Sequence, residues 1–583
     1  MASCLYCRTK KIKCSRKSED ESCSRCLLRK QKCINKSTED LVVVKSDDMK
    51  KQMEEIRVLK ARIAELEKQK LIEKNKPEGF ESLTVHACVN CSTSSFKFCN
   101  YLNDCLEGQV KKLRNADLQL EGFDGDFVKE EVILPSKYEA LRLLNIAYST
   151  VCNDYYLLVL STTLTFVDEV YNATNLARLL KLELARLFFL FALGEFYTHT
   201  YKSRAGNLCG SEYFKTGLSF LRDTYESPSL AQIEVLLLAT IYFNSAALVK
   251  QAYVYVGICS RLAIILGLNN SNNEDQRSDR GQRIICTIFT LEVALCSLLG
   301  YRISFSNTVV NVTNLISDSI SNHDLGETYI LKKRLALAVV NEQIIDQIYL
   351  TGQNDEQLFS SINRILKDLN TFYDELMNEW EEMKASSKRI FKRSRISLKL
   401  RFNECMILAI RPILYSVFLS RGNLATQREN QSEALSHAIK LSERSVSAAL
   451  SNIHIVSDLF SEEGFSSWGY YDVYFLFSAS IVIVLASSMD VFATTTVQDT
   501  NMTLEQFNDK IVGLFQHIAD MGYPTARGLK ESICQLREKL NGTNQTQLNS
   551  SLNSYLLDPS NLEKMLEEID SYDFDIDFAN NAF

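Results

Sequence analysis

The feature that most constrains this chain is a pair of identical cysteine units within its first 33 residues. Each unit has the spacing C-x2-C-x6-C, and eight residues separate the two units. Two thiolates at C-x2-C spacing can close on one tetrahedral metal ion, which favours a metal-stabilised fold for this segment. The six candidate metal ligands are Cys4, Cys7, Cys14, Cys23, Cys26 and Cys33.

Six thiolates cannot complete two separate tetrahedral sites, because two such sites need eight ligands. Either one ion is bound and two thiols are spare, or two sulfurs bridge two ions. The duplication favours two Zn2+ ions per chain, and the symmetry of the repeat predicts Cys4 and Cys23 as the bridging pair. A hydrophobic core is nearly absent from this segment, so we expect zinc binding to fold it.

Charge is distributed unevenly along the chain. Residues 1–37 contain 11 Lys or Arg and three acidic residues, a net charge of +8. The remaining residues contain 54 basic and 69 acidic side chains, a net charge of −15. A small basic segment on an acidic body is typical of a module that docks on a polyanion, and nucleic acid is the first candidate.

The composition of the whole chain indicates a mainly α-helical protein. Only 21 glycines and 6 prolines occur among 583 residues, which argues against turn-rich all-β architectures. The length predicts roughly three or four structural units. The N-terminal residues contain no apolar run of signal-peptide length, so we expect an intracellular chain whose 17 cysteines form no disulfides.

Residues 136–540 are expected to form one large all-helical regulatory domain. Apolar residues recur there with a period near 3.6, as in amphipathic or fully buried helices. The most apolar stretch has only 17 residues between Asp472 and Asp490, short of the roughly 20 needed to span a bilayer, so a buried helix is favoured over a membrane span. The expected helices cover residues 176–197, 230–242, 253–268, 283–299, 330–348, 396–419 and 472–489.

Residues 38–48 are expected to be a linker, and residues 49–73 a short coiled coil. Apolar residues fall seven apart in two series offset by three, and the flanking charges are opposite in sign. This pattern predicts parallel pairing of two copies, although a solvated amphipathic helix that never dimerises is the alternative. The predicted dimerisation residues are Met49, Ile56, Leu59, Ile63 and Leu66.

Residues 74–135 are expected to be an irregular linker region that contains a second group of cysteines. A second zinc site is chemically feasible there because His86 adjoins the group, but ordinary reduced thiols are the favoured interpretation. The seven cysteines farther along the chain are expected to be buried thiols. The members of the second group are Cys88, Cys91, Cys99 and Cys105.

Residues 541–583 are expected to be a disordered polar tether followed by an acidic tail. Residues 556–583 contain eight acidic side chains and one lysine. Alternation of large apolar residues with Asp is typical of an activation segment that binds coactivators, and a merely solubilising terminus is the alternative. The apolar residues of this segment are Tyr572, Phe574, Ile576 and Phe578.

Residues 3–33 resemble the zinc binuclear cluster of fungal transcription factors, on the strength of the six-cysteine spacing and the basic stretch between the second and third cysteines. In that family the basic stretch forms a short helix that enters the major groove. A lysine three residues before the third cysteine reads a CGG triplet there, and Lys11 holds that position. Arg8, Lys10 and Lys13 can reach phosphates. The family usually has a proline before the fourth cysteine, and this chain has none between residues 15 and 22.

The helical body resembles the regulatory domain of the same family, which implies an all-helical fold. The resemblance is carried by residues 191–197, by Tyr213-Phe214, by Gln232 ahead of residues 236–239, and by residues 255–268. It extends to about residue 310, although Cys286-Thr287 stands where the family commonly has paired tryptophans. A small-molecule effector is compatible with such a domain, and the sequence does not identify one.

Enzymatic chemistry is not indicated by any motif of the sequence. There is no phosphate-binding GxxxxGK[ST] loop and no HExxH, and the six histidines form no i, i+4 pair. In the segment 464–469 the second glycine comes one residue too late for a nucleophile elbow. We therefore do not expect an enzyme.

Together these features predict a nuclear DNA-binding transcription factor that binds paired CGG-type triplets as a homodimer and activates transcription. A repressor or dual regulator with the same cysteine segment is one alternative. A zinc-dependent scaffold without DNA binding is another. No membrane association is expected.

Overall fold

The structure is a computed structural model that divides the chain into two compact units, Met1–Glu81 and Ser82–Phe583. We call the first unit the head and the second the body, and we describe each by itself. The structure describes residues 4–15, 22–30 and 33 of the head and residues 93–106 and 132–542 of the body. The gaps within 132–542 are residues 153–154, 156, 158, 174–179, 199–207, 222–227, 270–277, 308–328, 351–354, 386–391, 425–432, 464–469, 493–495, 498–501, 522 and 524.

The head contains two short helices, α1 (Leu5–Thr9) and α2 (Ser24–Leu28), that begin at equivalent points of the cysteine repeat. Cys4 is the N-cap of α1 and Cys23 is the N-cap of α2. The turn after each helix contains a lysine with a left-handed backbone, at φ 52° for Lys11 and 49° for Lys30. A positive φ is uncommon for a residue with a Cβ, so its occurrence at both positions shows that the two cysteine repeats of the head fold alike.

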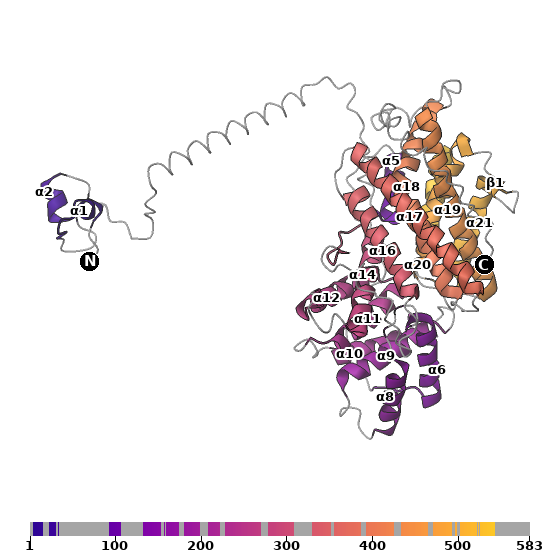
Figure 1. The fold of residues 1–583 in the computed structure, drawn as a ribbon, viewed down its shortest axis with the longest axis horizontal. Helices are drawn as coiled ribbons and strands as arrows, with labels where there is room; N and C mark the ends of the chain where they lie inside the picture. The colour runs from indigo at the N-terminus through magenta and orange to yellow at the C-terminus, as the bar shows by residue number, and fades with distance from the viewer. Residues whose placement is uncertain are drawn as a thin grey trace. The chain divides into compact units, whose positions relative to one another are not determined.

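The body is mainly α-helical, as the sequence predicts (Figure 1). Its described residues also contain one short antiparallel pair, in which Thr496 of β1 lies opposite Thr503 of β2. The elements are α5 (Ser95–Leu106), α6 (Lys137–Ala147), η1 (Tyr148–Cys152), α8 (Leu160–Asn172), α9 (Lys181–Phe196), α10 (Ser211–Leu221), α11 (Leu230–Ser245), α12 (Val249–Ile265), α14 (Asp279–Leu299), α16 (Tyr329–Gln343), η4 (Ile344–Leu350), α17 (Asp355–Ala385), α18 (Lys392–Leu424), α19 (Glu433–Glu463), α20 (Tyr470–Ser487), η6 (Asp490–Phe492), β1 (Thr496–Val497), β2 (Met502–Thr503), α21 (Leu504–Asp520) and α22 (Ala526–Gly542).

Each of the seven apolar segments singled out in the sequence overlaps a helix, namely α9, α11, α12, α14, α16, α18 and α20. The apolar character of these helices reflects burial inside the body. Two stretches, Asp279–Leu299 and Ser394–Leu419, are long and apolar enough to cross a membrane, but 83% and 94% of their apolar windows are buried in the protein. Such burial is typical of core helices, which need apolar residues on every face.

The helices pack as two sets that are joined through α14 and α16. In one set, α9 packs against α6, α10 and α11, and α11 continues to α12. In the other, α18, α19 and α20 pack together, with α21 and α22 against α20 (Figure 1). α14 contacts α12 and α16, and α16 contacts α18, so one continuous core runs through the body.

The structure corrects the expectation that residues 74–135 are irregular, because Ser95–Leu106 form α5. This helix packs against α20 and α22, and it buries Phe98, Cys99 and Leu102. The Phe98 ring meets the Tyr415 ring edge-on with centroids 5.9 Å apart. α5 therefore belongs to the body, and its apolar face packs against residues that lie more than 300 positions later in the sequence.

Several predicted segments lie outside the described residues. They include the linker at 38–48, the coiled coil at 49–73 with Met49, Ile56, Leu59, Ile63 and Leu66, residues 543–583 with Tyr572, Phe574, Ile576 and Phe578, and the cysteines Cys88 and Cys91. The side chain of Cys105 is also outside the description. Cys99 is described, and its thiol is buried and donates to the backbone carbonyl of Ser532 at 3.8 Å.

Candidate metal centre and nucleic-acid interface

The six cysteine sulfurs of the head gather in two groups of four. One group contains Cys4, Cys7, Cys14 and Cys23, and the other contains Cys4, Cys23, Cys26 and Cys33. Within each group all sulfurs lie within 4.8 Å of one another. Cys4 and Cys23 belong to both groups, and they are the pair that the symmetry of the repeat predicts as bridges.

The distances between the sulfurs fit zinc ligation. Cys4 Sγ lies 3.7 Å from both Cys23 Sγ and Cys26 Sγ, and Cys7 Sγ lies 3.7 Å from Cys23 Sγ. Zn–S bonds of about 2.3 Å place two ligands of one tetrahedron about 3.8 Å apart. A disulfide would bring the sulfurs to about 2 Å. The separations therefore match sulfurs that could share a metal ion and do not match disulfides.

Backbone N–H groups hold the sulfurs in place in both cysteine repeats of the head. The Cys4 N–H donates to Cys14 Sγ at 3.5 Å, and the Cys23 N–H donates to Cys33 Sγ at 3.3 Å. These two bonds are equivalent under the 19-residue offset of the repeat. At Cys33 the N–H of Cys23 acts to lower the pKa, but burial and the neighbouring thiols of Cys4 and Cys23 outweigh it, so the pKa of Cys33 is raised.

The two shared cysteines are also the two thiols whose pKa is lowered. For Cys23 the pKa falls to about 6, chiefly because the Cys26 N–H donates to its sulfur at 3.4 Å. For Cys4, burial acts to raise the pKa, but hydrogen bonds from the Cys7 backbone and from neighbouring thiols outweigh it. Burial raises the pKa of Cys7 to about 12, so a metal must displace the proton of that thiol on binding.

The cysteines make up most of the core of the head. Cys4, Cys7, Cys23 and Cys26 are almost fully buried, whereas Cys14 and Cys33 are partly exposed. Tyr6 and Ile12 pack against this cluster. Among the described residues of the head, no apolar side chain outside the cysteines is fully buried, so a ligated metal would supply the cohesion that a hydrophobic core supplies elsewhere.

Basic side chains cover the described surface of the head. Seven Lys and Arg residues are exposed there, and residues 4–15, 22–30 and 33 contain no acidic side chain. α1 ends at Thr9, so Lys10 and Lys11 lie in the turn that follows the helix, and Lys13 lies in the irregular segment after it. The resemblance implied that this whole stretch would be helical. The exposed cations are Arg8, Lys10, Lys11, Lys13, Arg25, Arg29 and Lys30.

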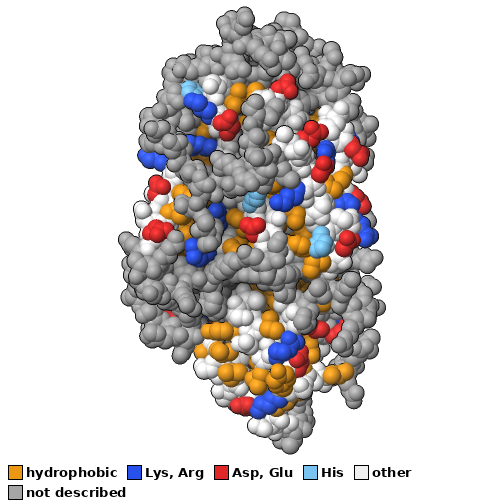
Figure 2. Space-filling view, turned by 90° about the vertical axis from the view of Figure 1, so that its right-hand side faces the viewer, with side chains coloured by type: hydrophobic (Ala, Val, Ile, Leu, Met, Phe, Trp, Pro, Cys, Tyr) orange, Lys and Arg blue, Asp and Glu red, His pale blue; other side chains and the backbone are white. Residues whose placement is uncertain are grey.

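The second cysteine repeat of the head supplies cations that the sequence alone did not indicate. Lys30 occupies the position equivalent to Lys11, with the same left-handed backbone. Arg29 corresponds to Lys10, and its guanidinium donates to the Tyr6 hydroxyl at 3.3 Å, which links the second cysteine repeat to the first. The 19-residue repeat is the signal that would have identified both residues. The face of the body shown in Figure 2 differs, because acidic and basic side chains are interspersed on it.

Comparisons with known proteins concern the body. Residues 156–444 match the family model described as the fungal specific transcription factor domain, which covers just under half of the chain. An uncharacterised transcriptional regulatory protein of Schizosaccharomyces pombe is 21% identical over 330 residues. That match covers 52% of this chain and 38% of the length of the relative. Both findings support a role in transcription regulation, and neither names an enzymatic activity.

Proposed function

We propose that the protein is a nuclear transcription factor that binds paired CGG-type triplets through a two-zinc head and acts as a homodimeric activator. The observation that carries this proposal is the pair of four-sulfur groups that share Cys4 and Cys23. The body would regulate the activity of the head, in keeping with its match to the fungal specific transcription factor domain.

The six cysteines would hold two Zn2+ ions. Zinc supplies no reaction here, and its role is to fix the thiolates and thereby the backbone of both units. α1 and the turn after it would then present Lys11 in a defined orientation. Lysine donates to the O6 and N7 acceptors of guanine, and the other exposed cations would contact phosphates on either side.

The shared ligands provide the sharpest test of the metal centre. We expect the full chain to contain two zinc ions, measured by elemental analysis against protein concentration. Cys4→Ser or Cys23→Ser removes a ligand from both groups and should reduce the content below one ion. Cys14→Ser removes a ligand from one group and should leave about one ion. Equal zinc content in Cys4→Ser and Cys14→Ser would contradict the shared arrangement.

DNA binding is tested by selecting sites from random duplexes with the full chain. The expected product is a pair of CGG-type triplets whose binding weakens steeply with salt, because several cations contact phosphates. Zinc binding without salt-sensitive DNA affinity would instead favour a scaffold. The spacing and order of the two triplets would follow from the same experiment.

The activator role rests on the composition of residues 541–583. Fusing this segment to an unrelated DNA-binding domain should activate a reporter. Replacing Tyr572, Phe574, Ile576 and Phe578 with Ala in the same fusion should abolish activation while the acidic charge is unchanged. A fusion without reporter activity would favour a repressor.

A further inference from the structure

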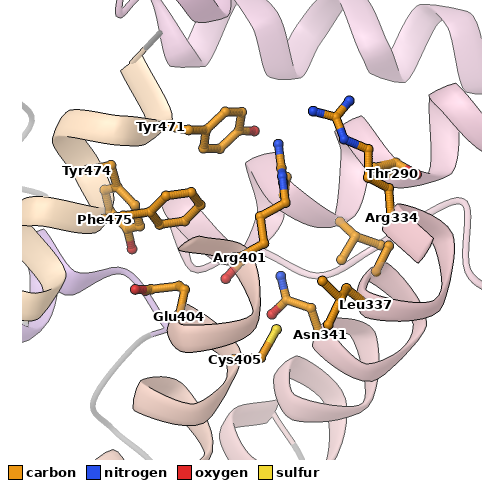
Figure 3. A pocket seen from close by; sticks show the side chains of 14 residues that line it. Thr290, Arg334, Leu337, Asn341, Arg401, Glu404, Cys405, Tyr471, Tyr474 and Phe475 are labelled. Atoms are coloured by element: carbon orange, nitrogen blue, oxygen red, sulfur yellow. The ribbon is translucent and has the colours of Figure 1, made fainter. Parts of the chain in front are cut away.

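A cavity of about 40 Å³ lies in the body where four helices meet. Its walls come from α14, α16, α18 and α20 (Figure 3). The cavity holds about three water-sized groups, because roughly 10–15 Å³ of such space is enough for one water molecule.

The polar groups around this cavity are unusually poorly satisfied for a buried position. Glu404 Oε2, Asn341 Oδ1 and Thr290 Oγ1 have no hydrogen-bond partner among the described residues. Glu404 and Thr290 are each only 5% exposed. A buried polar atom without a partner is unfavourable. The Thr290 hydroxyl, and Glu404 when it is protonated, can donate to an oxygen atom of an occupant, so such an occupant would be favoured. These three atoms come from three different helices beside one cavity.

Two cations stand at the same cavity and are held by aromatic rings. The Arg401 guanidinium lies 4.9 Å from the ring centre of Tyr471, and the Arg334 guanidinium lies 5.0 Å from the ring centre of Tyr155. Arg334 also donates to Ser397 Oγ at 3.2 Å. Figure 3 shows both guanidinium groups at one end of the site, near Tyr471. Their positions are therefore set before any ligand arrives, which reduces the entropic cost of binding.

The single acidic side chain of the lining does not cancel these cations. Glu404 Oε1 accepts a hydrogen bond from Ser478 Oγ at 2.9 Å, on the side where Arg411 also binds Ser478. Burial raises the pKa of Glu404 to about 7, against the opposing effect of Arg411. Near neutral pH the lining thus carries a net positive charge, together with a carboxyl that is partly protonated and can donate to an oxygen.

We propose that this cavity binds the carboxylate group of a small organic acid, with Arg401 and Arg334 as the cationic partners. Leu337, Val293 and Phe475 provide apolar walls for a short carbon chain next to the carboxylate. A cationic ligand would face two fixed guanidinium groups and is disfavoured. The occupant would contact α14 and α16 on one side and α18 and α20 on the other, so binding would stabilise their packing.

The inference rests on the proposed function in one respect: as an effector site, the cavity would tune a transcription regulator. Its test is binding itself. We choose propionate as the probe and propionamide as its neutral control, and measure the thermal unfolding midpoint of the full chain at constant ionic strength. Propionate at about ten times its Kd should raise the midpoint by about 1–2 °C, whereas propionamide should not.

Two variants and one control connect the effect to the cavity. Arg401→Gln removes one cationic partner, and Ala294→Met fills the cavity from α14. Both should abolish the propionate shift. Arg261→Gln is the matched control, because this exposed arginine on α12 contacts the Gly257 carbonyl and does not line the cavity. If Ala294→Met fails to fold, Arg401→Gln still decides the outcome.

A shift that is specific for propionate, kept in Arg261→Gln and lost in Arg401→Gln, supports the site. The absence of a shift up to the solubility limit of propionate, or a shift of equal size in wild type and Arg401→Gln, overturns it. Zinc content and DNA-site selection do not depend on this cavity, so they can fail or succeed independently of propionate binding.

Discussion

The head and the body are stabilised by different means. In the head, the four most buried apolar residues are all cysteines, and the two helices are five residues each. In the body, long helices share one continuous hydrophobic core. One chain therefore specifies the fold of the head through the spacing of metal ligands and the fold of the body through its pattern of apolar residues. We expect the stability of the head to depend on metal, and that of the body to depend on side-chain volume and pH.

Removal of zinc should have the largest effect and should act on the head alone. We expect a strong chelator to abolish specific DNA binding, a loss of about 10³-fold or more in affinity. The far-ultraviolet circular dichroism should change little, because the body supplies nearly all the helix. Loss of most helicity on chelation would break the proposed division between the two units.

A change of volume in the body should affect stability without affecting zinc. A Cβ at Gly194 of α9 would collide with the backbone carbonyl of Leu143 on α6. Gly194→Ala should therefore lower the free energy of unfolding by about 3 kcal/mol, measured by urea denaturation. Gly513→Ala is the matched control on α21. A Cβ there meets nothing within 4 Å, so this variant should gain about 0.5–1 kcal/mol from helix propensity.

Stability of the body should also depend on the protonation of Glu404. The native pKa of about 7 exceeds the usual 4.5, so the folded state retains a proton that the unfolded state has lost between these pH values. The contribution of this group is fully present below about pH 4.5 and is lost as the pH rises through 7, on the order of 3 kcal/mol. Glu404→Gln should remove that slope from the unfolding free energy measured between pH 4.5 and 8. A slope that persists unchanged in Glu404→Gln would assign it to other groups.

The smallest expected effect distinguishes base contacts from phosphate contacts within the head. Lys11→Ala should cost about 1–3 kcal/mol at the selected triplet and little on unrelated DNA. Lys30→Ala is its matched control, because Lys30 has the same left-handed backbone and exposure. Lys30→Ala and Lys10→Ala should weaken binding to all sequences alike. Equal loss of specificity in Lys11→Ala and Lys30→Ala, in fluorescence-anisotropy titrations, would refute the assigned roles.

The sequence predicted most of the long core helices because each contains a long, largely apolar stretch. It did not single out α17, α19 or α5. In α17 and α19 charged and polar residues interrupt the apolar ones, so neither helix contains a long apolar stretch, although the apolar residues recur on one face. α5 is a 12-residue helix, and its burial depends on Tyr415 and on α20 and α22, which follow hundreds of residues later.

By itself, the sequence determined the cysteine pairs, the basic head and the helical class of the body, because ligand spacing, charge and periodicity are local properties of the chain. The repeat also predicted Cys4 and Cys23 as the shared pair. Only the tertiary structure decided that their sulfurs lie 3.7 Å apart, and that Arg401, Glu404 and Asn341 meet at one cavity. Such meetings depend on how distant helices and loops pack in three dimensions, and no local pattern of residues encodes those distances.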